Sequence, residues 1–262
     1  MRNALATLIV VTVALLASGA RSADLSIAKD DVGQFWLQII GPIEDGDDVK
    51  FRALLVDAIN RGEQIARVSV YSSGGQPDAA MMIGRYIRGL HLATVAPQLM
   101  PLLGRHTCDV YAVGARARVL EYDPLRQRGD PRCACSGACV LVWAAGAIRH
   151  GDAVQLQGAA AADSDLPPNT DGEPTETYLR DMGMPDETIS RMSIPAPDRI
   201  GYLTIAERRM LANGAVIPSL RNLYAERCSH RTAASPAALA CEKAVIRELY
   251  WAGARRLLGG ND

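Results

Sequence analysis

This sequence has no excess of charge of either sign. Its 262 residues include 28 lysine or arginine and 29 aspartate or glutamate residues, and the net charge is −1. A strongly basic surface draws proteins to nucleic acid, so this balance gives no reason to expect a nucleic-acid partner. Internal repeats are missing, as are the motifs of nucleotide, flavin and metal sites. We therefore expect neither a cofactor nor a bound metal ion.

Long hydrophobic runs are equally scarce. Only residues 4–17 form one, and these fourteen apolar or threonine residues fall short of the roughly 20 that a membrane-spanning helix needs. The run follows the basic Arg2 and precedes small residues, which is the layout of a secretory signal peptide. We predict a signal peptide over residues 1–22, cleaved near Ala20 to Ala23, and a periplasmic or secreted protein. An uncleaved membrane anchor is the alternative.

Cysteines are few, but their number is even. In an exported chain, six cysteines predict disulfides, because bridges form and persist outside the cytoplasm. The six are Cys108, Cys133, Cys135, Cys139, Cys228 and Cys241. A zinc site formed by the first four is the alternative, although the paired C-x2-C spacing usual for zinc is missing. We expect Cys108 to pair with Cys133. Cys228 and Cys241 form the distal pair.

The first third of the mature chain alternates between short apolar runs and amphipathic segments. Residues 35–41, 66–73 and 92–97 read as buried strands, and glycine or proline ends the first two. Residues 44–60 carry apolar side chains at helical spacing, and Pro77 opens a second helix. Strands that alternate with helices predict an α/β fold with a parallel sheet and right-handed crossovers.

The rest of the chain is less regular at first and then helical. Residues 98–132 are rich in glycine, proline and arginine, and we interpret them as an irregular insertion with a hairpin at residues 110–122. Residues 136–148 are apolar on all sides, which predicts a buried helix. Residues 153–158 read as another strand. The remainder is mostly helical and ends in a helical extension over residues 216–262.

Short motifs in a fixed order give the chain a family resemblance. They read "GPIEDGDD", "VSVYSSGGQPDAAMMIGRYIRGL", "ATV", "CSGACVLVWAAG" and "YLRDMGMPDETISRM". In this order they resemble exported bacterial proteins related to the Clp protease proteolytic subunit, whose ClpP/crotonase-like fold signal peptide peptidase A also has. The resemblance covers residues 35–97 and 133–215. It implies a ClpP/crotonase-like domain over residues 23–215, a disulfide between Cys135 and Cys139, and a homo-oligomer.

The resemblance also implies a site built on a serine. A serine at the start of a buried helix acts as nucleophile, and two backbone N–H groups face the developing oxyanion. Ser136 is the candidate nucleophile, and Gly75 and Gly137 are the candidate donors. Gly74 completes the Gly-Gly turn, where the absence of side chains lets a ligand approach. An ordinary turn between a strand and a helix is the alternative.

The register of Ser136 is open. Exported relatives read Cys-Ala-Ser-Ala-Cys, which places Gly137 at the nucleophile position and turns Ser136 away by roughly 100°. The Ser-Gly-Gly pattern of signal peptide peptidase A instead keeps Ser136 in register. A third interpretation makes Ser136 the N-cap of the buried helix.

A proton-accepting base is missing where the resemblance implies one. The expected position carries Gln157 and Gly158, and glutamine does not accept a proton near neutral pH. The four histidines are His91, His106, His150 and His230, and the three lysines are Lys29, Lys50 and Lys243. At 1.5 Å per residue, a helix of about twelve residues puts His150 roughly 18 Å from Ser136. Asp198 resembles the triad acid but has no histidine to orient.

Loss of the base from a serine triad lowers turnover by about 10⁶-fold. The sequence therefore predicts a catalytically degenerate exported protein that acts by binding or assembly, with a site that holds a carbonyl or anionic group. A serine peptidase or hydrolase is the alternative. It would use Ser136, with a base such as His106 supplied by the insertion or by another subunit.

Overall fold

A computed structural model of the chain describes thirteen stretches of it. They are residues 22–30, 32–102, 105–110, 118–123, 128–129, 135–151, 153–156, 158–159, 174–194, 203–212, 214–215, 217–228 and 235–259. The predicted signal peptide lies outside them except for Ser22, as do Gln157, Asp198 and His230. Of the insertion beyond Gln98, the structure describes backbone only.

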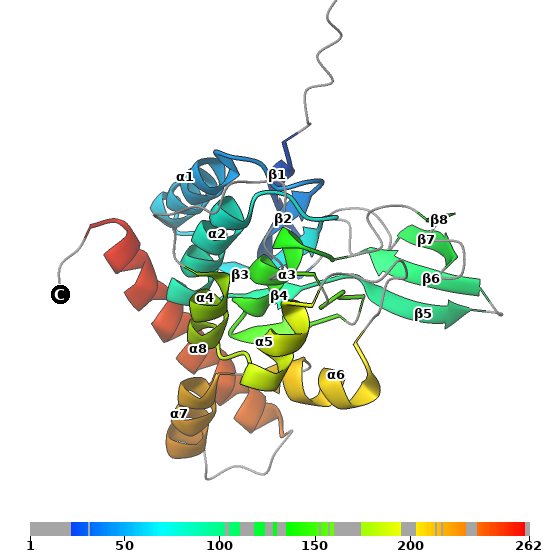
Figure 1. Cartoon of the computed structure of the whole chain (residues 1–262). Coiled ribbons are helices and arrows are strands. Elements are labelled where there is room, and N and C mark those ends of the chain that lie inside the picture. The colour runs from blue at the N-terminus through cyan, green and yellow to red at the C-terminus, as the bar shows by residue number, and fades with distance from the viewer. Residues whose placement is uncertain are drawn as a thin grey trace, which may run out of the picture.

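A six-stranded sheet forms the centre of the described molecule (Figure 1). Its strands, in spatial order, are β1 (Asp24–Lys29), β2 (Phe35–Ile40), β3 (Ile65–Tyr71), β4 (Ala93–Val95), β9 (Ile148–His150) and β10 (Gly214–Ala215). The four inner strands are parallel, which confirms the α/β class. The parallel pairing predicted for the strands at residues 35–41, 66–73 and 92–97 is confirmed. The two edge strands β1 and β10, which were not predicted, are antiparallel to their neighbours, so the sheet is mixed.

The predicted helices of the first half are present as α1 (Asp47–Asn60), α2 (Pro77–Gly89) and α3 (Ala138–Ala144). The third is shorter than the predicted 136–148. Its last turn contacts β4, where Thr94 Oγ1 donates to Trp143 O at 2.8 Å and a Cβ at Gly146 would stand 2.2 Å from Thr94 Oγ1. Residues 148–150 then form β9, the strand that lies beside β4. The change from helix to strand was not predicted, because a short apolar segment is compatible with either structure.

Residues 153–158 were expected in the main sheet but do not join it as a strand. In the described part of this segment, Val154 makes a single parallel bridge with Cys135. The backbone N–H of Cys135 donates to Ala153 O at 2.9 Å, and that of Gln155 donates to Cys135 O at 2.8 Å. The segment thus supports the turn before α3, and β9 occupies the place in the sheet that we expected it to take.

The insertion is a second, antiparallel sheet, so the expectation of an irregular segment is wrong. Its strands are β5 (Gln98–Leu102), β6 (Arg105–Val110), β7 (Arg118–Asp123) and β8 (Arg128–Gly129). Figure 1 shows them projecting from one side of the main body. The predicted hairpin is confirmed, since β6 and β7 are antiparallel neighbours and Val110 pairs with Arg118. The strands were missed because frequent glycine, proline and arginine residues interrupt the alternation of apolar and polar residues by which short strands are recognised.

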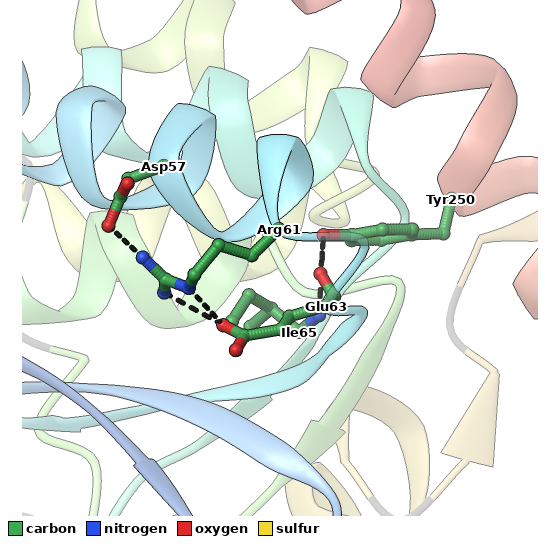
Figure 2. Close-up of polar contacts among 5 residues, drawn as sticks. All are labelled: Asp57, Arg61, Glu63, Ile65 and Tyr250. Atoms are coloured by element: carbon green, nitrogen blue, oxygen red, sulfur yellow. Dashed lines mark hydrogen bonds and ion pairs between the residues drawn. The ribbon is translucent and has the colours of Figure 1, made fainter.

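The last third of the described chain is helical, as expected. It contains α4 (Thr175–Asp181), α5 (Asp186–Met192), α6 (Ile205–Leu211), α7 (Pro218–Cys228) and α8 (Pro236–Leu257). The buried Tyr250 of α8 donates its hydroxyl hydrogen to Glu63 O and accepts from Ile65 N, both at 3.3 Å (Figure 2). In the same view Arg61 bridges the carboxylates of Asp57 and Glu63. The helical extension therefore packs on the turn that starts β3.

Two arginines, the buried Arg149 and the half-buried Arg88, join the helix ends to the sheet. Arg149 of β9 donates to Ala144 O at 2.5 Å and to Met182 O at 2.6 Å, and Arg88 of α2 donates to the same two carbonyls. These carbonyls lie at the carboxyl ends of α3 and α4, where backbone acceptors lack helical partners. Burial lowers the pKa of Arg149 to about 9 and that of Arg88 to about 10, so both remain cations at neutral pH.

Two disulfides are present among the described side chains. Cys135 bonds to Cys139 and Cys228 bonds to Cys241, as expected, and the second bridge joins α7 to α8. Because Cys135 and Cys139 are bonded to each other, the alternative of a zinc site that uses them is wrong. The side chains of Cys108 and Cys133 lie outside the described residues.

None of the helices in the described stretches is both long enough and apolar enough to cross a membrane.

We predict that the oxidised protein contains a third bridge, between Cys108 and Cys133, and no free thiol. Alkylation of the native protein followed by non-reducing peptide mapping tests this. One alkylated cysteine, or a peptide that links other partners, would contradict it. Replacing Cys228 and Cys241 by serine should lower the free energy of unfolding by about 3 kcal/mol, because the bridge closes a loop of about a dozen residues and so restricts the unfolded chain.

The contact of α8 with the end of α2 predicts a large effect of one methyl group. A Cβ at Gly253 would stand 2.2 Å from the backbone oxygen of Gly89, whereas a Cβ at Gly89 meets nothing within 4 Å. Gly253→Ala should therefore lower the free energy of unfolding by about 1–3 kcal/mol. Gly89→Ala is the matched control and should leave it unchanged or raise it by up to about 1 kcal/mol. Urea denaturation compares the two, and equal effects would contradict this packing.

Candidate functional site

The candidate site lies where β3 ends at the carboxyl edge of the parallel strands, the edge at which α/β sheets commonly bind ligands. Here residues 72–75 turn back beside Ile43, which follows β2. The N–H of Ile43 donates to Gly74 O at 2.9 Å, and Gln76 N donates to Ile43 O at 2.7 Å. A Cβ at Gly75 would stand 2.0 Å from Ile43 O, so only glycine fits there.

Ser72 stabilises this turn from within. Its hydroxyl donates to Gly74 O at 2.9 Å and accepts from Gly74 N at 3.2 Å, and the residue is almost completely buried. Gly74 has φ 128° and Gly75 has φ 122°, values that favour glycine. Ser72 was not predicted from the sequence as part of the site. A serine two residues before a glycine, here the first of a Gly-Gly pair, is a turn signal that could have identified it.

The start of α3 lies directly against this turn. Ser136 N donates to Ser72 O at 3.3 Å, and Ser136 Oγ donates to Ser73 O at 2.9 Å. A Cβ at Gly137 would stand 3.3 Å from Gly74 Cα, so two glycine backbones touch. The structure thus brings together Gly74, Gly137 and Ser136, which the sequence analysis selected from distant segments.

Gly137, and not Ser136, is the N-cap of α3. Its backbone has φ 52° and ψ −129°, a conformation that side chains rarely permit, and it makes no side-chain cap. Ser136 lies one residue earlier, and its hydroxyl donates to a carbonyl instead of accepting from a helix N–H. The interpretation of Ser136 as N-cap is therefore wrong. The preference for serine at the N-cap holds for a residue in extended conformation. The residue that begins α3 has a positive φ instead, and glycine adopts that conformation more readily than serine.

A disulfide holds the turn that presents Gly137. Cys135 and Cys139 flank it, their Cα atoms are 5.2 Å apart, and both are fully buried. The bridge to Val154 fixes the other side of Cys135. The helix start is thus covalently tied on one side and hydrogen-bonded to the residues before Gly74 on the other.

Two backbone donors remain open at this contact. Within the described stretches, neither the N–H of Gly75 nor that of Gly137 donates to an acceptor. Gly74 differs, since its N–H is taken by the Ser72 hydroxyl. The N–H groups of Gly75 and Gly137 are the two that the sequence analysis named as donors for a developing oxyanion.

No described histidine or lysine hydrogen-bonds to Ser136. His150 is on β9 and not at the end of a twelve-residue helix, because α3 has only seven residues. Its carbonyl accepts from Trp143 Nε1 and from Ala96 N, both at 3.0 Å.

The other candidate bases are engaged elsewhere or lie outside the described side chains. Lys50 pairs with Asp47 at 3.0 Å, and Lys29 lies over the Phe35 ring. His91 follows α2, where burial and then the charges of neighbouring arginines lower its pKa. Gly158, at the position implied for the base, donates its N–H to Ile194 O at 2.8 Å. The side chain of His106 lies outside the described residues, as do Gln157, Asp198 and His230.

Comparison with known proteins gives no match: no protein-family model, no curated protein and no solved structure matches this chain. What the site can do must therefore be argued from its own residues. It offers two backbone donors, a serine hydroxyl engaged with a carbonyl, and a glycine in the conformation that begins α3.

The two residues at the start of α3 should respond differently to substitution by alanine. Gly137→Ala should lower the free energy of unfolding by about 1–3 kcal/mol, because φ 52° strains any side-chain residue. Ser136→Ala removes one hydrogen bond of a half-buried hydroxyl and should cost about 1 kcal/mol or less. Urea denaturation of both variants measures the difference. A larger loss for Ser136→Ala would contradict the assignment of Gly137 as the conformationally constrained residue.

Proposed function

We propose that the chain is an exported ClpP/crotonase-like protein without hydrolytic activity, which binds a carbonyl or anionic group between the Ser72–Gly75 turn and Gly137. One observation carries the proposal: within the described stretches, the N–H groups of Gly75 and Gly137 donate to no acceptor. Gly137 begins α3 and has no side chain, and its backbone contacts that of Gly74. Each donor comes from a segment that is independently fixed by a hydrogen-bonded turn or by a disulfide.

The conformation of Gly137 supports the loss of the nucleophile. Serine hydrolases often present their nucleophile from a sharp, strained turn before a helix, so that the hydroxyl projects into the site. Gly137 lies in a sharp turn before α3 whose backbone would strain a residue with a side chain, and the cysteine register of the exported relatives places the nucleophile at the same residue. Glycine there has no hydroxyl. The neighbouring Ser136 directs its own hydroxyl to Ser73 O.

The remaining chemistry is that of binding. Backbone N–H groups that converge on one oxygen stabilise a carbonyl or a carboxylate by hydrogen bonds that need no side chain. Cleavage of a peptide bond also requires a nucleophile and a base to accept its proton. A peptide or a small carboxylate would therefore bind here and leave unchanged.

Export is part of the proposal. The two disulfides fit a protein that folds in an oxidising compartment, since such bridges rarely persist in the cytoplasm. The layout of residues 1–22 supports the same assignment.

A fluorophosphonate probe separates this proposal from the serine hydrolase alternative. We expect no labelling of the native protein above the level of a heat-denatured control, because no base activates a serine. Mass spectrometry of the labelled digest gives the measurement. Stoichiometric labelling that Ser136→Ala abolishes would establish a hydrolase. A His106→Gln variant would then show whether the insertion supplies the base.

A further inference from the structure

A cavity lies on the sheet, apart from the contact between Gly74 and Gly137. The register of the strands brings its residues together, since Trp36 pairs with Arg67 and Val95 pairs with His150. Paired residues of neighbouring strands point to the same face of a sheet. The cavity measures about 230 Å³, and these four residues line it together with residues that follow β4 and β9.

Hydrogen-bond donors gather in this cavity. Trp36 is only 5% exposed, and its indole N–H has no acceptor in the described part of the chain. The Arg67 guanidinium lies over the Trp36 ring, 3.9 Å from the ring centre. Partial burial, together with the charge of Arg67, lowers the pKa of His150, so its ring is neutral at pH 7 and can donate one N–H. The nearest described carboxylate to Arg67 is that of Asp30, at 3.6 Å.

A larger cavity adjoins the first and shares Arg67 and His150 with it. It measures about 610 Å³ and lies between the amino-terminal ends of the parallel strands and helix α8. Phe35, Ala93 and Ile148 line it from the sheet, and Ile246 lines it from α8. Besides Arg67, two acidic and two basic side chains line it, Glu63, Glu242, Lys243 and Arg247. The larger cavity thus combines apolar walls with charges of both signs, and its basic side chains outnumber its acidic ones.

We propose that the paired cavities bind a small carboxylate that carries an apolar tail. The carboxylate accepts hydrogen bonds from the Arg67 guanidinium and the Trp36 indole N–H, a charge-assisted arrangement stronger than a neutral one. The tail lies against Ile148 and Ile246 in the larger cavity, where burial of apolar surface adds affinity. This site involves none of the residues of the crevice at Gly75 and Gly137, so it stands independently of the function proposed above.

Proton–nitrogen spectra of the tryptophan indoles provide the readout. The chain has three tryptophans, and Trp36→Phe identifies the signal of Trp36. The protein is titrated with hexanoate, with acetate and with the neutral hexanamide. We expect hexanoate to shift the Trp36 signal saturably and to bind roughly tenfold or more tighter than acetate, because its tail is buried. Hexanamide, which has the tail but no charge, should bind roughly tenfold or more weaker than hexanoate.

Variants assign the two halves of the ligand. Arg67→Met should weaken hexanoate binding roughly tenfold or more, whereas Arg52→Met, at an exposed arginine of α1, should leave it unchanged. Ile246→Asn should weaken hexanoate and leave acetate unaffected. Thermal unfolding of each variant checks the fold. If Arg67→Met does not fold, the comparison of hexanoate with hexanamide on the wild-type protein decides the point.

Three results would overturn the proposal. Equal affinities for hexanoate and hexanamide would show that the carboxylate does not contribute to binding. Equal affinities for hexanoate and acetate would show that the apolar tail does not contribute. Hexanoate that moves the backbone amide signals of Gly75 and Gly137 but not the Trp36 indole would place the ligand in the crevice instead. That last outcome would support the proposed function while contradicting this one, so the two fail separately.

Discussion

The contact between Gly74 and Gly137 is the constraint on which the candidate site depends. It joins the end of β3 to the start of α3, and it depends on the missing side chain of Gly137, whose Cβ would stand 3.3 Å from Gly74 Cα. Hydrogen bonds hold the first backbone, and the Cys135–Cys139 bridge holds the second. Two open N–H groups result, at Gly75 and Gly137. A site built from fixed backbone loses little entropy when it binds a ligand.

The far end of α3 is held as firmly as its start. Arg149 and Arg88 donate to the carbonyl of Ala144, and Tyr178 donates to Leu141 O at 2.9 Å. Burial raises the pKa of Tyr178, which therefore stays a neutral donor across the physiological range. A short apolar helix of seven residues has little stability of its own, so these contacts and the disulfide determine where it lies.

Sequence patterns predicted the parts of the fold whose signals are local. The strand before Gly41, the helix opened by Pro77 and the pairing of β6 with β7 all follow from periodicity and turn residues. The antiparallel pairing of β1 with β2 was missed, although only five residues separate the two strands and Gly33, with φ 81°, is a hairpin signal that the sequence offers. The end of α3 was missed for another reason, since the hydrogen bond from Thr94 to Trp143 O is a long-range contact.

The motifs predicted that Gly74, Gly75 and Gly137 would meet, but the backbone angles of Gly137 decided how Ser136 lies. We propose that the N–H groups of Gly75 and Gly137 bind carbonyl groups and that the bound molecule is not cleaved. An amide spectrum of the labelled protein, titrated with N-acetyl-alanyl-alanine, tests this. The Gly75 and Gly137 signals should shift together and saturate, and the peptide should be recovered intact. Hydrolysed peptide, or two signals that do not move at saturating peptide, would contradict it.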